Sequence, residues 1–231
     1  MVKDVVLAFY TACSVFLMVY SVTQAVLLCR LGWAMLRRRV ADVPPQPDFW
    51  PPVLVQLPIY NEKYVVARLL EAVAAFDYPR HQLTIQVLDD STDDTAEVVA
   101  SLVSQYRRRG LPIQHIRRPD RAGFKAGALA YGLDRAPHAE YVVIFDADFT
   151  PAPDVLRRLL PYFATHERVG FVQGRWGHLN AGDTWLTRAQ ALNIDAYYAV
   201  EQAARSSLGT VMSFNGTGGM WRVEAIRAAG G

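Results

Sequence analysis

The chain has 231 residues, of which 52% are apolar and 20% are charged, and its formal net charge is +2. This length suffices for one domain of ordinary size with an appendage, and so small a net charge gives no support for a nucleic-acid partner. The two cysteines, Cys13 and Cys29, lie sixteen residues apart in one apolar segment. A helix would hold them roughly 24 Å apart, which excludes a disulfide within it. With neither a disulfide framework nor a zinc-ligand spacing, the soluble part fits a reducing compartment.

The first element predicted along the chain is a transmembrane helix. Residues 5–29 form an apolar run without charge, and about 20 apolar residues are enough to cross a bilayer. A signal peptide and a buried core helix are the alternatives, but a signal peptide has a basic start and a shorter apolar core. Here the basic residues follow the run: Arg30, Arg37, Arg38 and Arg39. We therefore expect a helix in a plasma, inner or Golgi-type membrane over residues 1–36, with everything beyond it in the cytoplasm.

A linker is predicted over residues 37–52. This segment contains five prolines, at positions 44, 45, 47, 51 and 52. Proline-rich linkers are extended and stiff rather than flexible. The globular domain is therefore expected to begin at residue 53, and we let it run to residue 231.

From residue 53 onward, short apolar runs alternate with amphipathic segments. The runs predict strands, and the segments between them predict helices that end near Ala75 and Arg109 or span residues 123–135 and 153–165. Ser91 or Thr92 is a candidate cap for the second helix. Such alternation is typical of an α/β fold with a mainly parallel sheet and helices on both faces. The predicted strands are residues 53–57, 84–88, 113–116, 141–145 and 169–173.

Residues 183–207 form a separate, long helical stretch. Its apolar residues cluster without forming one clean stripe, and they include Trp185, Leu186, Leu192, Tyr197 and Tyr198. A core helix and a helix that lies in the membrane interface both fit this pattern.

The stretch YVVIFDADFTPAP (141–153) carries the chemistry around which the domain is organised. An apolar strand ends in two carboxylates, Asp146 and Asp148, and two prolines then turn the chain. In an α/β sheet, ligands collect at the carboxyl ends of the strands. Two hard oxygen anions there suit Mg²⁺ or Mn²⁺ that also holds a phosphate. The alternative is a solvated turn.

Two further strand ends and one loop bring polar groups to the same edge. The first strand ends in LPIYNE (57–62), the second in DDSTD (89–93), and RAGFKAGA (121–128) follows the third. Glycines in that loop allow close backbone approach to a ligand, and Lys125 supplies charge for a phosphate. Asp89 and Asp90 are alternatively helix caps, and Glu62 alternatively serves a helix dipole. Taken together, these groups predict a pocket for a nucleoside diphosphate.

The order and the residues of these segments resemble those of the inverting, nucleotide-sugar-dependent family-2 glycosyltransferases. Within that family, the chain is similar to the membrane-embedded cellulose-synthase-like branch, which makes β-linked polysaccharides, and above all to glucan and mannan synthase-like enzymes. The resemblance covers nearly all of residues 53–222 and implies a GT-A type, Rossmann-like fold. It is carried by VLVQLPIYNE (53–62), IQVLDDSTDDT (85–95), RAGFKAGAL (121–129), VIFDADFTP (143–151), VQGRW (172–176) and FNGTGGMWR (214–222).

The resemblance implies a role for each matching residue. The donor, a UDP- or GDP-sugar, would be bound by Tyr60, Glu62, Asp89, Asp90, Lys125 and Asp146, with Lys125 on the diphosphate. The divalent metal, Mg²⁺ or Mn²⁺, would be held by Asp148 together with Asp146. The glycan acceptor would lie near Phe214, Asn215, Gly216 and Thr217, with Trp176 or Trp221 stacked on a sugar ring.

One departure from the family pattern concerns the general base that takes the acceptor proton. The family supplies it from a Thr-Glu-Asp segment, which is expected beyond Gly231, and the Gln-x-x-Arg-Trp motif of the processive enzymes is also absent. We therefore expect the chain to be the N-terminal part of a longer enzyme or a truncated product. Such a chain would bind donor and metal but transfer sugar poorly or not at all.

Two rival functions remain open at this point. One is a non-catalytic module that binds a nucleotide-sugar and acts through a partner. The other is a haloacid-dehalogenase-type phosphatase, because Asp146, Asp148 and Thr150 fit an Asp-x-Asp-x-Thr loop in which Asp146 is the nucleophile. In that family, however, the lysine and the carboxylate pair follow the loop, and here they precede it. A dinucleotide-binding dehydrogenase is not indicated, because no Gly-x-Gly-x-x-Gly follows the first strand.

Overall fold

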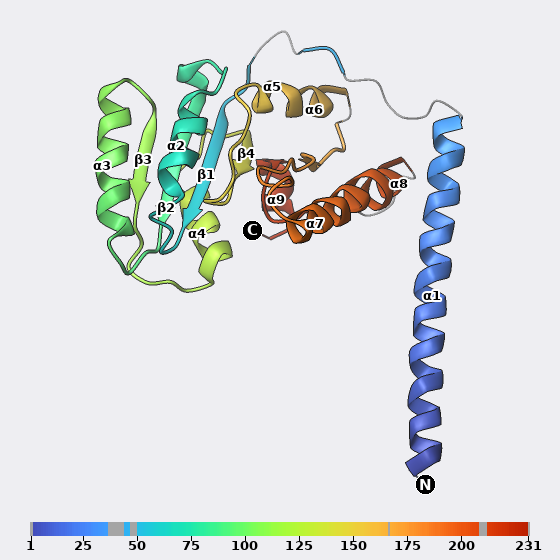
Figure 1. Ribbon diagram of the computed structural model, residues 1–231. Helices are drawn as coiled ribbons and strands as arrows, with labels where there is room; N and C mark the ends of the chain where they lie inside the picture. Colours follow the sequence, from blue (N-terminus) through green and yellow to red (C-terminus); the bar gives the residue numbers. More distant parts are fainter. Residues whose placement is uncertain (1, 37–43, 47–49, 166, 208–211, 231) are drawn as a thin grey trace. The chain divides into compact units, whose positions relative to one another are not determined.

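The computed structural model describes residues 2–36, 44–46, 50–165, 167–207 and 212–230 (Figure 1). The chain divides into two compact units, one of residues 1–42 and 175–213 and the other of residues 43–174 and 214–231. Much of the predicted linker over 37–52 lies outside the described residues, and the predicted boundaries 1–36, 37–52 and 53–231 stay a prediction. Trp50 packs edge-on against Tyr78, with 5.5 Å between the ring centroids. The sheet-bearing unit therefore includes residues slightly before the first strand.

The first unit contains the long N-terminal helix α1 (Val2–Leu36). Its segment Val2–Trp33 has a mean hydropathy of 2.1 and is long and apolar enough to cross a membrane. None of its most apolar stretch is buried in protein, unlike the core helix of a soluble domain. Two hydroxyl groups in the helix are hydrogen-bonded to backbone carbonyls one turn earlier. Thr11 donates to the carbonyl of Leu7 and Thr23 to that of Val19, both at 2.8 Å. The predicted helix over 5–29 lies within α1, which is a candidate transmembrane span.

The same unit contains three consecutive helical segments, which confirms the helix predicted over 183–207. They are α7 (Trp185–Ala196), a π-helical turn η2 (Tyr197–Gln202) and α8 (Ala203–Ser207). Thr184 and Thr187 form a capping box at the start of α7. Tyr198 and Ala204 are buried, and η2 and α8 contact α1. In α7, by contrast, Trp185, Leu186 and Leu192 are exposed, so the interfacial helix stays a prediction for that segment.

The second unit is built on a six-stranded sheet with the order β3-β2-β1-β4-β6-β5, of which Figure 1 labels β1 to β4. Pairs β1–β2, β2–β3 and β1–β4 are parallel, whereas β6 is antiparallel to both β4 and β5. The mainly parallel sheet is therefore confirmed, and β6 is a strand that sequence reasoning missed. The strands are β1 (Val53–Ile59), β2 (Leu83–Asp89), β3 (Ile113–Ile116), β4 (Tyr141–Ile144), β5 (Phe171–Gln173) and β6 (Gly219–Arg222).

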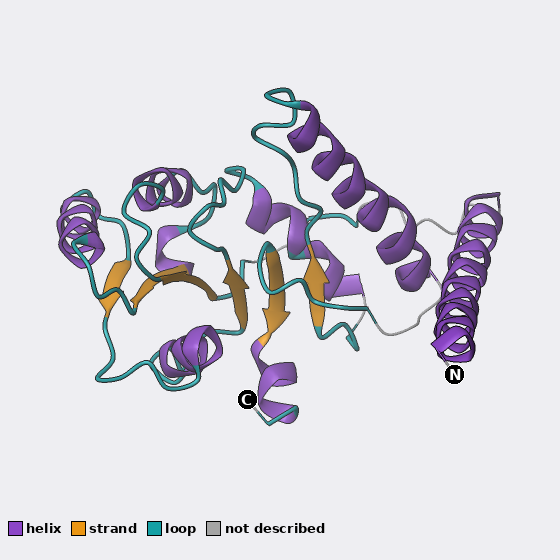
Figure 2. Cartoon of the chain, turned by 60° about the horizontal axis from the view of Figure 1, so that its bottom comes forward, coloured by secondary structure: helices purple, strands orange, loops and turns teal. Residues whose placement is uncertain are grey.

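Helices cover both faces of the sheet (Figure 2). One face carries the larger core, in which strand residues such as Val55 and Leu57 pack with Leu69 of α2, Val99 of α3 and Leu156 of α5. The other face carries a small cluster of Leu54, Val142 and Val223 beside α4 and α9. The helices of this unit are α2 (Val66–Ala74), η1 (Arg80–Gln82), α3 (Thr95–Arg108), α4 (Phe124–Leu133), α5 (Val155–Leu159), α6 (Pro161–Thr165) and α9 (Val223–Ala228).

The observed element boundaries differ from the predicted ones at two prolines. Pro58 was expected to end the first strand, but β1 continues to Ile59. The amide of Phe145 donates to the Gln56 carbonyl, so the backbone groups of Gln56 point toward β4. Pro58, two residues later in the same strand, points to the same side, but the pairing with β4 has already ended at Ile144. The missing amide of Pro58 therefore costs no ladder bond. Pro161 has the opposite effect, because the helix predicted over 153–165 is divided into α5 and α6 at this residue.

Helix α4 is docked on the sheet by two buried glutamines. Gln56 Nε2 donates to the Leu129 carbonyl at 3.0 Å and to Gln86 Oε1 at 3.2 Å, and Gln86 Nε2 donates to the Gly132 carbonyl at 3.0 Å. Buried amides keep their position because an unpaired polar group in the interior is costly. This pair fixes the placement of α4, and the first turn of α4 carries Lys125.

Candidate functional site

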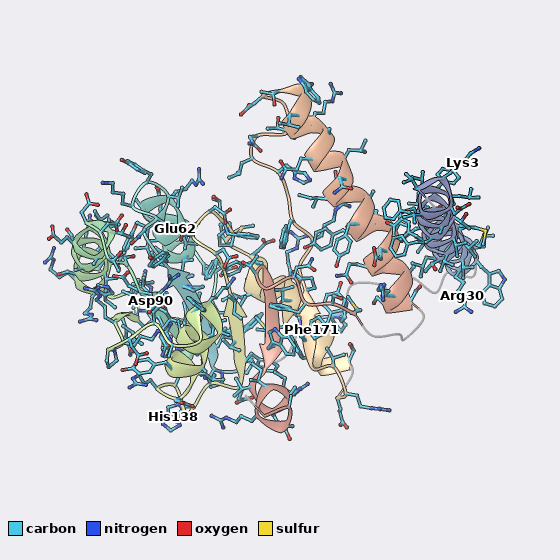
Figure 3. All side chains as sticks on the ribbon, turned by 90° about the horizontal axis from the view of Figure 1, so that it is seen from below. Lys3, Arg30, Glu62, Asp90, His138 and Phe171 are labelled. Carbon is cyan, nitrogen blue, oxygen red and sulfur yellow. The ribbon has the colours of Figure 1, made fainter. Side chains whose placement is uncertain are left out.

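The predicted site residues gather where three parallel strands end. Tyr60 and Glu62 follow β1, Asp90 follows β2, and Asp146 follows β4. Because β1 is paired in parallel with both β2 and β4, their carboxyl ends lie at one edge of the sheet. Figure 3 labels Glu62 and Asp90 in this unit. The edge expected from the sequence is thus present in the structure.

Asp89 is enclosed by protein groups. Its side chain has no exposed surface, and Oδ1 accepts from the Ser91 amide at 2.9 Å, while Oδ2 lies 2.8 Å from Nε2 of His115. Burial by itself would raise the pKa of Asp89, but the hydrogen bonds from His115 and Ser91 outweigh it and hold the pKa below its ordinary value. Asp89 therefore holds the loop after β2 in an ionised, structural role, and its predicted contact with the donor stays a prediction.

Asp90 is held by a bidentate pair with Arg118. Arg118 Nε donates to Oδ1 at 2.8 Å and a terminal nitrogen donates to Oδ2 at 2.6 Å. The same guanidinium donates to the carbonyls of Ala122 and Phe124. Arg118 thus joins the end of β2 to the loop that leads into α4. Sequence reasoning did not single out Arg118, although a basic residue just after the third strand faces the same acidic edge.

The prediction that Ser91 or Thr92 caps the helix after β2 is wrong. Helix α3 begins at Thr95, and its N-cap is Asp94. Ser91 Oγ instead accepts from the amide of Asn61 at 3.0 Å, and the Thr92 amide donates to Asn61 Oδ1 at 2.9 Å. Asn61 adopts a positive φ of 57°, which asparagine tolerates better than most residues. These bonds tie the loop after β1 to the loop after β2.

Tyr60 carries a stacked guanidinium. The guanidinium carbon of Arg121 lies 3.3 Å from the ring centroid of Tyr60, and the Tyr60 side chain is exposed. Arg121 also lies 3.9 Å from Asp90 Oδ2. A flat cation on an aromatic ring forms a cation–π pair, so Tyr60 and Arg121 together offer a planar, positively charged surface at this edge. Arg121 is a second arginine that sequence reasoning did not assign.

Lys125 links α4, β4 and the loop before β6. Its Nζ donates to Asp146 Oδ1 and, at 3.0 Å, to the carbonyl of Gly216. The Asp146 amide donates to the buried hydroxyl of Thr217 at 2.9 Å. The loop before α4 packs closely on the helix at Gly127, where a Cβ would lie 2.1 Å from the Ala122 carbonyl oxygen, so this position requires glycine. Residues that are far apart in the sequence thus meet in one cluster.

The loop of residues 214–218 is held in place by Gln173. Its Oε1 accepts from the Asn215 amide at 2.9 Å, and its Nε2 donates to the Thr217 carbonyl at 3.0 Å. Phe214 packs on Trp221, with centroids 5.1 Å apart. The structure therefore brings together Phe214, Asn215, Gly216, Thr217 and Trp221. The remaining residue predicted to contact the acceptor, Trp176, belongs to the other unit, where its ring lies 5.8 Å from that of Tyr198.

Two carboxylates at this edge, Asp146 and Asp148, are the candidate ligands of a divalent cation, and a third, Glu62, lies near them. Asp148 is exposed and Asp146 is half-buried. Burial raises the pKa of Glu62, and the nearby carboxylates of Asp148 and Asp146 raise it further. Among the described residues, no group of three or more His, Cys, Asp or Glu is arranged to hold a metal. A magnesium-type site needs fewer protein ligands, because one or two carboxylates combine with substrate phosphates and water. Asp146 with Asp148 fits that requirement.

Comparison with known families agrees with this geometry. The model described as "Glycosyltransferase like family 2" matches residues 51–231. The chain belongs to glycosyltransferase-like family 2. The phosphatase interpretation of Asp146 and Asp148 is not favoured by this match.

Two curated relatives of this glycosyltransferase-family chain are named glucomannan 4-beta-mannosyltransferases. Number 2 of Arabidopsis thaliana is 40% identical over 215 residues, which cover 89% of this chain and 40% of the relative. Number 1 of Oryza sativa subsp. japonica is 41% identical over 185 residues, which cover 79% of this chain and 36% of the relative. The chain thus spans about two fifths of the length of these relatives, and the predicted resemblance to mannan synthase-like enzymes is confirmed.

A solved structure is similar over most of the chain. It is the mannosyltransferase PcManGT from Pyrobaculum calidifontis in complex with GDP-Man and Mn²⁺, with 28% identity and a TM-score of 0.66. The match covers 90% of this chain and 57% of the mannosyltransferase. The predicted fold class is confirmed: a GT-A type α/β sheet with flanking helices, preceded by an apolar helix that is a candidate transmembrane span.

Proposed function

We propose that this chain forms the donor-binding part of an enzyme that transfers mannose from GDP-mannose to a growing β-linked polysaccharide, with inversion. The observation that carries the proposal is the carboxylate pair Asp146 and Asp148 beside Lys125 at the sheet edge of a family-2 chain. The names of the two plant relatives support mannose and a glucomannan-type acceptor. The GDP-Man and Mn²⁺ bound to PcManGT support a guanine nucleotide and Mn²⁺ over a uracil nucleotide and Mg²⁺.

The groups at the edge have distinct tasks in this proposal, and Glu62 would bind the donor. Asp146 and Asp148 would hold the cation, and Lys125 would contact the diphosphate. When bound, the cation would offset the charge that develops on the leaving diphosphate. The planar surface of Tyr60 and Arg121 suits a nucleobase, since bases stack on aromatic rings and guanidinium planes. Asp89 and Asp90 serve the nucleoside by fixing the loops around it through His115 and Arg118.

The loop before β6 and helix α1 have the two remaining tasks, acceptor binding and membrane attachment. Phe214 and Asn215 precede Gly216, whose carbonyl accepts from Lys125, and would face the glycan together with Trp221, which packs on Phe214. Buried Thr217 accepts from the Asp146 amide and so holds the loop at the end of β4. Helix α1 would anchor the enzyme in the membrane with the sheet-bearing unit in the cytoplasm. The orientation rests on positive charge after the helix, and Arg37, Arg38 and Arg39 lie outside the described residues.

Calorimetric titration of the detergent-solubilised chain tests the donor site. GDP, UDP, GDP-mannose and UDP-glucose are titrated with and without Mn²⁺. We expect metal-dependent binding of the guanine nucleotides, weakened at least about tenfold by Asp148→Ala, because even outer-shell ligand contacts are worth about that much in metal affinity. Asp154→Ala is the matched control, since Asp154 is an exposed carboxylate in the same segment after β4 and its side chain does not cap α5.

The outcomes separate the remaining alternatives. Binding of GDP-mannose together with transfer of labelled mannose to a β-mannan oligosaccharide supports the enzyme. Binding without transfer agrees with a donor-binding part, since transfer also needs a general base. Mn²⁺-dependent binding of UDP-glucose alone would mean that the donor sugar is glucose and not mannose. Equal binding by wild type and Asp148→Ala would remove the metal from the proposal.

A further inference from the structure

Lys125 has two partners that belong to different parts of the site. Its ammonium group donates to the carboxylate of Asp146, a predicted metal ligand, and to the carbonyl of Gly216, in the loop predicted to face the acceptor. The Lys125 side chain is 40% exposed and that of Asp146 is 36% exposed. Both groups can therefore be reached by an ion or a nucleotide from solution. The task proposed above for Lys125, contact with the diphosphate, uses neither of these bonds.

A divalent cation bound to Asp146 would share this carboxylate with Lys125. The carboxylate is already neutralised by the ammonium group, and a cation placed on it would meet a like charge at short distance, which is unfavourable even in a partly solvated site. A diphosphate changes this balance. Its negative oxygens attract both charges, so the ammonium group gains a new partner when it leaves the carboxylate.

We propose that Lys125 is a placeholder cation, which occupies Asp146 until a nucleotide diphosphate arrives, so that the metal ion and the nucleotide bind together. This inference rests on the proposed function and adds an order of binding to it. The metal ion alone binds weakly, and the nucleotide opens the metal position by drawing Lys125 to its phosphates.

The second bond of Lys125 extends this coupling to the acceptor side. When Lys125 moves to the phosphates, the Gly216 carbonyl loses its donor. The loop keeps its place, because Gln173 still binds Asn215 and Thr217, and Thr217 still binds Asp146. Donor binding would therefore remove the Lys125 hydrogen bond to Gly216, while the other bonds keep residues 214–218 in place.

Electron paramagnetic resonance of free Mn²⁺ tests the placeholder directly and needs no turnover. The detergent-solubilised chain is titrated with Mn²⁺ alone and with Mn²⁺ plus GDP. We expect Lys125→Gln to bind Mn²⁺ alone about fivefold more tightly than wild type, as removal of a partly exposed ion pair suggests. The gain in Mn²⁺ affinity caused by GDP should shrink in the same variant.

Arg68→Gln is the matched control for nonspecific charge. Arg68 is an exposed cation whose guanidinium donates to the backbone oxygen of Asp148 at 3.4 Å. Within the part of the chain that the structure describes, it forms no hydrogen bond or ion pair with Asp146. Its removal should change Mn²⁺ affinity less than about twofold. Lys125→Met repeats the experiment with an uncharged side chain of similar length, and circular dichroism confirms that each variant is folded.

The outcomes are distinguishable from those for the donor site. An unchanged or equally unmeasurable Mn²⁺ affinity in Lys125→Gln and Lys125→Met overturns the placeholder, even if Mn²⁺ and GDP together still bind. An equal increase in Arg68→Gln also overturns it, because the effect would then be general electrostatics. Failure of Mn²⁺ and GDP to bind wild type at all overturns the proposed function itself.

Discussion

At the scale of single residues, the partners of each carboxylate at the sheet edge decide what it can do. Asp89 and Asp90 are held by His115, Ser91 and Arg118 and shape the loops. Asp148 is exposed and is open to a ligand from solution. Glu62 is partly buried near Asp148 and Asp146, and its raised pKa reflects this environment. A carboxylate kept in a partly buried, negative environment is a feature of functional sites.

The raised pKa of Glu62 predicts a pH-dependent effect of Glu62→Gln on stability. A carboxyl whose pKa is higher in the folded state than its ordinary value of 4.5 disfavours folding once it ionises. Glu62→Gln should therefore increase the free energy of unfolding at pH 7. The increase should disappear as the pH falls below about 4.5, because the carboxyl is then neutral in both states.

Denaturant unfolding between pH 3.5 and 7.5, in the absence of divalent ions, measures this difference. Glu71→Gln is the control, since Glu71 is an exposed glutamate on the neighbouring helix α2. A Glu62→Gln variant that is less stable than wild type at pH 7 would contradict the prediction.

At the scale of elements, the placement of α4 depends on close packing over buried amides. Gly132 on α4 faces the two glutamines, and a Cβ there would lie 2.5 Å from Gln86 Oε1, 2.6 Å from Gln56 Nε2 and 2.8 Å from a Leu88 methyl carbon. The helix can approach the sheet this closely only with glycine at that position. Because α4 carries Lys125, the same contact sets the height of the ammonium group above Asp146.

Gly132→Ala should lower the free energy of unfolding by about 2 kcal/mol, which is typical of overpacking in a closely packed interior. The better helix propensity of alanine offsets only part of this loss. Thermal unfolding of the detergent-solubilised chain measures the change, with Gly177→Ala as the control because a Cβ at Gly177 would meet nothing within 4 Å. Equal stability of Gly132→Ala and wild type would mean that α4 can shift away from the glutamines.

At the scale of the whole molecule, one long apolar helix accompanies a sheet with a polar edge. The apolar segment Val2–Trp33 is long enough to span a bilayer, while the sheet is enclosed by its own helices (Figure 2). The first unit also carries exposed apolar residues on α7, namely Trp185, Leu186 and Leu192. Two features of the first unit are therefore able to contact a membrane.

Removal of residues 2–36 tests which feature anchors the protein. Because a span of this hydropathy inserts far more strongly than an interfacial helix, the full chain should remain in the membrane pellet after an alkaline carbonate wash. The truncated chain should move to the supernatant. A truncated chain that still sediments with membranes, and is released by Trp185→Ser combined with Leu192→Ser, would assign the attachment to α7 instead.

The sequence by itself determined most of the elements, their order and the edge at which polar residues meet. Short apolar runs and long helical stretches are local properties, so the strands at 113–116 and 141–145 and the helix over 183–207 could be predicted with small boundary errors. The strand-end carboxylates Asp146 and Asp148 could be found for the same reason, since a buried apolar run followed by charge marks the end of a strand.

Only the tertiary structure decided which groups are partners. Strand β6 comes from residues more than seventy positions after β4 and runs antiparallel to it, and its four residues have no local pattern that distinguishes them from a loop. The pairs Arg118–Asp90 and Lys125–Asp146 likewise join residues 28 and 21 positions apart. The energy of a charge pair depends on the distance between its atoms and on their burial, and both are set by the packing of α4 and the loops rather than by neighbouring residues in the chain.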